Sequence, residues 1–129
     1  MNRHSLNAAI LSMAPAFEAR PFAPSTLAEL MRAPRLVGWD GASDKTIYRD
    51  PKVNHAFRAW HDAEHVAGAH AFDLEGEAAT CRAQIAGLLK RYPQAPQWLL
   101  DIVRREVIGQ VEYQNATGHF PMDQEAFHA

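Results

Sequence analysis

The chain of 129 residues is 47% hydrophobic and 22% charged, with a formal net charge of −2. Its length suits one domain with a substantial core, and its hydrophobic fraction excludes wholesale disorder. The near balance of charge disfavours a broad nucleic-acid-binding surface. The lack of a long apolar run excludes a transmembrane helix and leaves at most peripheral membrane contact. The single cysteine, Cys81, cannot form an intrachain disulfide and favours a cytoplasmic protein.

The N-terminal third is predicted to hold short elements. Residues 1–24 are expected to form an arm or a short helix. Thr26 and Glu29 then fit a capping box, in which a hydroxyl and a carboxylate satisfy backbone amides at the start of a helix.

Residues 35–50 are rich in glycine and aspartate, which is typical of loops and turns. Within them, the apolar pairs Leu36-Val37 and Ile47-Tyr48 could form one minimal hairpin. No other strand is expected in the chain.

Two long helices begin at clear capping signals. Asp50 precedes Pro51, a residue favoured at the first helical position, so a helix is predicted over residues 51–69. Asp73 is the expected cap of a second helix over residues 74–91. Because the two segments are joined by a short connection, we expect them to pack against each other.

Pro96 begins a third helix that is predicted to reach about Asn115, with Gly118 just beyond its end. Pro121 could begin a final turn or two that reaches Phe127. The prediction is therefore a single all-α domain over residues 1–129, with four to six helices.

The segment WHDAEHVAGAHAFDLEGE carries the most informative chemistry. His61 and His65 are four residues apart, so one helix presents both imidazoles on one face, one turn apart. Two such nitrogens can bind one divalent cation. The alternative is a pair of histidines at the edge of the core, hydrogen-bonded to carboxylates.

Three acidic residues accompany this pair. Asp62 could be a ligand, could orient a ligand, or could be exposed. Glu64 could accept a proton from a ligand histidine or act as general base on metal-bound water. Glu77 could be a ligand, although a carboxylate in the first turn of a helix also interacts favourably with the helix dipole.

On a helical wheel of residues 74–91, the apolar stripe includes Leu74, Cys81, Leu88 and Leu89. Gln84 lies at the border of this stripe, on the same side of the helix as Glu77. These positions make Gln84 a candidate to support a metal ligand.

In the third helix, Glu106 falls near the middle of an apolar face, where a carboxylate must be paired, protonated or metal-bound. Pairing with an arginine such as Arg104 or Arg105 is favoured slightly over direct ligation. Glu106 is thus predicted to support the site from outside the ligand set.

The sequence His61-Asp62-x-x-His65, followed by eleven residues and Glu77, resembles the metal motif of the Coq-four family of coenzyme Q biosynthesis. The nearby Leu74-x-Gly76-Glu77 is similar to the Leu-Gly-Glu context of that family, with one residue inserted. The resemblance implies an all-helical domain and a divalent metal, zinc by preference, held by His61, Asp62, His65 and Glu77. It also implies action on a prenylated aromatic acid, the precursor of ubiquinone.

Three functions therefore compete. The first is a metal-dependent enzyme, with Glu64 as its catalytic base, that acts on a small and hydrophobic molecule of the kind the resemblance implies. The second is an HD-type phosphohydrolase, which would need a further histidine upstream, His55, and a further aspartate downstream, Asp101, as ligands. The third is a non-catalytic interaction module with a structural metal or none, and an oligomer is compatible with each function.

Overall fold

The computed structural model describes residues 1–21, 24, 26–33, 35–41, 43 and 45–118. The helical elements are α1 (Arg3–Met13), α2 (Leu27–Arg32), α3 (Pro51–Gly68), α4 (Leu74–Arg91), α5 (Gln97–Arg104), the π-helical segment η1 (Arg105–Gly109) and α6 (Gln110–Thr117). Two short strands, β1 (Glu18–Arg20) and β2 (Val37–Trp39), complete the described elements. The prediction of a mainly helical domain is confirmed. The structure also contains a small sheet, formed by β1 and β2, in place of the predicted hairpin.

The capping residues act as predicted. The Asp50 side chain accepts a hydrogen bond from the Lys52 amide, and Pro51 is the first residue of α3. Asp73 accepts from the Gly76 amide at the start of α4. These short side chains satisfy amides that have no partner inside the helix, so both helices begin where the sequence places them.

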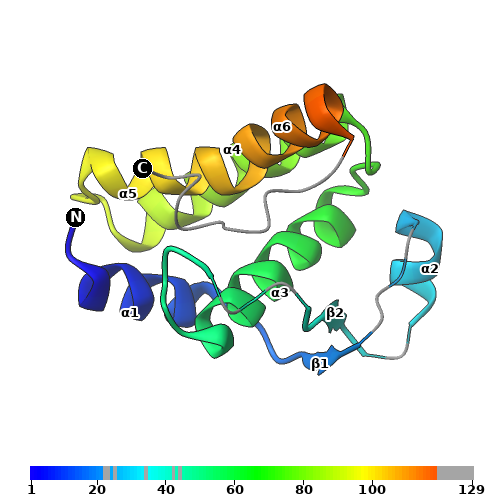
Figure 1. Cartoon of the computed structure of the whole chain (residues 1–129), viewed down its shortest axis with the longest axis horizontal. Helices are drawn as coiled ribbons and strands as arrows, with labels where there is room; N and C mark the ends of the chain where they lie inside the picture. Colours follow the sequence, from blue (N-terminus) through cyan, green and yellow to red (C-terminus); the bar gives the residue numbers. More distant parts are fainter. Residues whose placement is uncertain (22–23, 25, 34, 42, 44, 119–129) are drawn as a thin grey trace.

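Helix α3 is the centre of the fold, because α1, α2, α4 and β2 all pack against it. In Figure 1, α3 (green) crosses between α1 and the layer formed by α4, α5 and α6. The core that fills this space includes Leu6, Ile10, Val53, Phe57, Trp60, Leu88 and Val103. Segment 1–24 thus supplies a short helix whose Leu6 and Ile10 are fully buried.

The predicted hairpin within residues 35–50 is wrong. Strand β2 pairs in parallel with β1, and the register aligns Ala19 with Gly38. Ile47 and Tyr48 instead occupy a turn, with both side chains buried in the core. Their carbonyl groups accept hydrogen bonds from side chains of α1, so they are not used to pair with a strand.

The third predicted helix extends over α5, η1 and α6 as one path that contains a π-helical segment. Its end is confirmed, because Gly118 adopts a left-handed φ of 83° at the C-cap of α6. The predicted final turn at residues 121–127 lies outside the described residues. None of the helices in the described ranges combines the length and the apolar character that a bilayer span requires.

The buried face of α4 is rotated from its apolar stripe toward its polar side. Thr80, Cys81, Gln84 and Leu88 are buried, whereas Leu89 is 38% exposed and Leu74 is 50% exposed, which contradicts the predicted stripe at both ends. The cause is α3, which packs on the flank of α4 that carries Gln84. One apolar flank of α4 is left uncovered as a result.

The connection between α3 and α4 crosses very close to the first turn of α4. Ala69 ends α3 in the left-handed conformation, with φ 52°. A Cβ atom at Gly76 would lie 1.9 Å from the Ala71 carbonyl oxygen, a separation that backbone atoms cannot tolerate. Glycine is therefore required at this position for the connection to fold over α4.

Replacing Gly76 with alanine should lower the free energy of unfolding by about 1–3 kcal/mol, because the backbone of the connection must move. Gly87→Ala is the matched control in the same helix. A Cβ at Gly87 meets only Met13 Cε at 3.7 Å, so the better helix propensity of alanine should raise the stability by up to about 1 kcal/mol. Urea denaturation of both variants measures the difference, and equal effects would contradict the close approach.

Candidate metal centre

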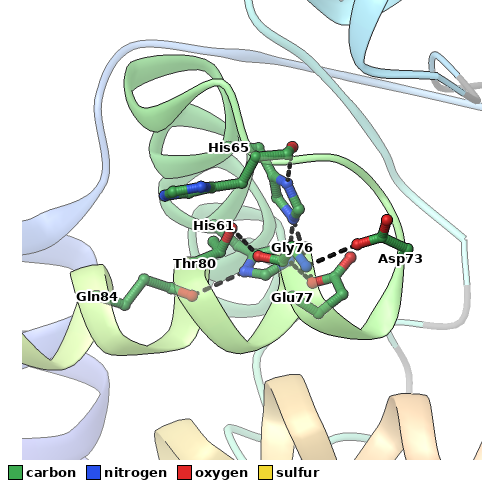
Figure 2. Close-up of polar contacts among 8 residues, drawn as sticks. His61, His65, Asp73, Gly76, Glu77, Thr80 and Gln84 are labelled. Carbon is green, nitrogen blue, oxygen red and sulfur yellow. Dashed lines mark hydrogen bonds and ion pairs between the residues drawn. The ribbon is translucent and has the colours of Figure 1, made fainter.

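Three side chains from α3 and α4 converge on one point (Figure 2). His61 Nε2 and His65 Nε2 are 3.1 Å apart. Glu77 Oε2 lies 2.8 Å from His61 Nε2 and 3.2 Å from His65 Nε2. The helical spacing of four residues aligns the two imidazoles, and Glu77 reaches them from the first turn of α4.

The outer ring nitrogens of both histidines are held by oxygen acceptors. His61 Nδ1 lies 2.7 Å from Gln84 Oε1, and His65 Nδ1 lies 2.8 Å from the carbonyl oxygen of His70. An amide or peptide oxygen can only accept a hydrogen bond, so each Nδ1 is the donor. When the rings are neutral, both Nε2 lone pairs therefore point to the shared centre.

The three inner atoms have the spacing of a metal ligand set. A tetrahedral cation with ligand bonds of about 2.0–2.1 Å separates neighbouring ligand atoms by about 3.3 Å. The observed separations of 2.8–3.2 Å differ from this value by a few tenths of an ångström. The cluster of His61, His65 and Glu77 can therefore hold a metal ion with little movement.

The cluster lies in a restricted and mostly apolar space. The His65 side chain is 1% exposed, whereas those of His61 and Glu77 are 17% and 14% exposed. Phe57 stacks on the His61 ring at 6.4 Å between centroids, and the ring of Phe72 meets His65 edge-on at 4.8 Å. These rings limit imidazole rotation, while the exposed edge of His61 and Glu77 leaves a path to solvent.

The charges of the cluster shift two pKa values in opposite directions. Burial would raise the pKa of Glu77, but hydrogen bonds and charge from His61 and His65 lower it to about 2. Burial would lower the pKa of His61, but the hydrogen bond and charge of Glu77 outweigh burial and raise it. In the metal-free protein, a protonated His61 and an ionised Glu77 therefore stabilise each other.

Asp62 and Glu64 do not join the converging atoms. Both side chains are partly buried on α3, and the group of ligand atoms within the described residues comprises His61, His65 and Glu77. Burial raises the pKa of Asp62, and the neighbouring charges of His61 and His65 offset part of that rise. Asp62 thus lies near enough to act on the cluster through its charge, but outside the ligand set.

Of the two residues predicted to support the ligands, Gln84 contacts His61 directly. Glu106 is 8% exposed and accepts a hydrogen bond from Gln110 at 2.6 Å, one turn along its own helical path. Burial raises the pKa of Tyr48, and the charge of Glu106 raises it further. Burial lowers the pKa of Arg58, and the charge of Glu106 offsets part of that fall. Glu106 therefore belongs to a separate buried polar group.

The ligands proposed for a phosphohydrolase lie elsewhere. Asp101 is on the exposed side of α5, where it accepts from Gln97 at 2.8 Å and lies 3.4 Å from Arg104. His55 contacts the carbonyl oxygen of Asp40 through its Nε2 atom. Neither side chain is in the converging group.

Two contributors to the site were not predicted. The acceptor of the His65 Nδ1 hydrogen bond is the backbone carbonyl oxygen of His70. Any residue at position 70 has this atom, so the sequence could not indicate the contact. Gly76 allows the connection that carries His70 to approach α4. The sequence had marked Gly76 only as part of the Leu-Gly-Glu context of the Coq-four resemblance, and not for this steric role.

Comparisons with known proteins found no relative of this chain. No family model, curated protein or solved structure matches the chain. The resemblance to the Coq-four family therefore stays a prediction, and the geometry of the cluster is the main evidence on function.

The metal-free protein should be more stable at about pH 6 than at about pH 8. The raised pKa of His61 gives stability that is fully present below its ordinary value of 6.5 and is lost as the pH rises through its folded value. Glu77, with a pKa of about 2, stays ionised throughout. Thermal melting after chelation measures this dependence.

His61→Gln should flatten the pH dependence between these two values, whereas His4→Gln, at an exposed position on α1, should keep it. A protein that gains stability toward pH 8 without metal would contradict the ion pair. Added zinc should stabilise more at the higher pH, because a cation binds neutral imidazoles.

Proposed function

We propose that His61, His65 and Glu77 bind one divalent cation and that the protein is a metal-dependent enzyme. The observation that carries this proposal is the convergence of three ligand atoms within 3.2 Å, with each outer imidazole nitrogen already bonded to an oxygen.

We propose zinc as the cation. Two imidazole nitrogens and one carboxylate oxygen form a donor set that zinc accepts, and the short Nε2–Oε2 distances suit its small tetrahedral shell. A bound zinc ion would polarise a substrate oxygen or lower the pKa of a water molecule. Gln84 and the His70 carbonyl would keep the imidazoles in the orientation that this chemistry requires.

Three protein ligands support a catalytic site over a structural one. Structural zinc sites are closed by four protein ligands, whereas catalytic sites leave one position to water or substrate. The partial exposure of His61 and Glu77 provides access to that position. Glu64, between the two histidines on α3, remains our candidate general base.

The resemblance to the Coq-four family extends the proposal to a hydrophobic small-molecule substrate, a prenylated aromatic acid. The single cysteine, Cys81, supports a cytoplasmic location. The HD-type phosphohydrolase is less well supported, because Asp62, His55 and Asp101 all lie outside the converging group. A structural metal is less well supported because the fold already has a hydrophobic core that spans α1, α3, α4 and α5.

Glu77→Gln should weaken zinc binding at least about 100-fold, because an amide loses the charge that balances the cation. Glu75→Gln is the matched control, since Glu75 is also acidic and in the first turn of α4 but is exposed. Competitive titration against a chromogenic chelator measures both affinities. Equal affinities would mean that Glu77 acts only on the helix dipole, which contributes about 0.3–1 kcal/mol.

The cobalt-substituted protein should change its visible spectrum when azide is added, because an open coordination position accepts the anion. Ile85→Val, which leaves the cluster untouched, should respond like the wild type. A spectrum that azide leaves unchanged would indicate a closed structural site. Melting with and without chelator gives an independent readout, since a structural site would lose most of its thermal stability with the metal.

A further inference from the structure

A second site lies on the flank of α4 that α3 leaves uncovered. A groove of about 630 Å³ runs between α4 and η1, a volume in the range of small-molecule sites. Its apolar lining includes Cys81, Ile85, Leu89 and Ile108. Leu89 is 38% exposed there, although it belongs to the apolar stripe of its helix.

The rim of this groove is positively charged. Arg82 from α4, Arg104 from α5 and Arg105 from η1 line it, and none of the described lining residues is acidic. Arg104 lies 3.4 Å from Asp101, but the two side chains are 50% and 57% exposed. Such an exposed ion pair contributes little to the stability of the fold. The Arg104 side chain can therefore leave Asp101 and bind another anion at a small cost in free energy.

An apolar floor and a guanidinium rim together define the chemistry of the occupant. The floor would bury a hydrocarbon chain, and the planar guanidinium groups match the geometry of a carboxylate. A protein chain on this surface would need acidic side chains spaced to three arginines. A single amphiphile meets both requirements with one head group.

We propose that the groove between α4 and η1 binds one long-chain carboxylate, taken up as a free molecule, with its chain on Ile85, Leu89 and Ile108 and its head group at Arg82 and Arg104. This site is separate from the proposed metal centre, because Glu77 and Gln84 lie on the flank of α4 that faces α3. The proposed binding of a carboxylate therefore does not depend on metal binding by His61, His65 and Glu77.

Isothermal titration of the whole chain with dodecanoate tests the proposal. Dodecanoate should bind at one site per chain, and at least about tenfold more tightly than dodecyltrimethylammonium, which has the same chain and the opposite charge. Acetate, which has the head group without the chain, should not bind. His61→Ala should retain dodecanoate binding, so failure of the metal centre and failure of the groove are distinguishable.

The double variant Arg82→Gln/Arg104→Gln should weaken dodecanoate binding at least about tenfold, because charged hydrogen bonds to the head group are lost. Lys90→Gln removes one positive charge from an exposed position on α4 that does not line the groove, and should leave the affinity unchanged. Ile85→Ser should weaken binding through the floor, and circular dichroism confirms that each variant is folded.

Three outcomes would overturn the proposal. The first is no saturable binding of dodecanoate. The second is equal binding of the cationic amphiphile, or an affinity that the double arginine variant leaves unchanged. The third is a dimer in sedimentation that Ile85→Ser dissociates, since a second copy of the chain would then be the occupant of the groove.

Discussion

The carboxylate of Glu77 between the imidazoles of His61 and His65 is the contact that ties α3 to α4 at their joined ends. Removing two imidazoles and a carboxylate from water is costly unless each polar atom gains a partner. Here every ring nitrogen and one carboxylate oxygen gain one. The cluster therefore adds a polar contact between the two helices to the apolar core that they share.

The sequence predicted this cluster because its determinants are local. The four-residue spacing of the histidines fixes one face of α3, and Asp73 fixes the start of α4. Together they place Glu77 one turn into α4, opposite that face. Gln84 follows, since it lies seven residues from Glu77 and on the same side of the helix.

Features that depend on distant segments could not be predicted in this way. The pairing of Ala19 with Gly38 joins β2, for which the sequence suggested the wrong partner strand, to β1, for which it gave no strand signal. Whether Asp62 joins the group of His61, His65 and Glu77 depends on a rotation of α3 that its neighbours set. The helical wheel of α4 predicted that Leu89 would be more buried than Gln84. The structure shows the reverse, because Gln84 accepts a hydrogen bond from His61 and the polar flank of α4 therefore faces α3.

That rotation links the two sites. When the polar flank of α4 turns toward α3 to satisfy His61, the apolar flank must turn away, and its residues then face η1 instead of the centre of the core. The chain gains a buried polar cluster and leaves apolar surface exposed. The apolar floor of the proposed groove therefore has the same origin as the buried histidine cluster, and the arginines at its rim would favour an anionic head group.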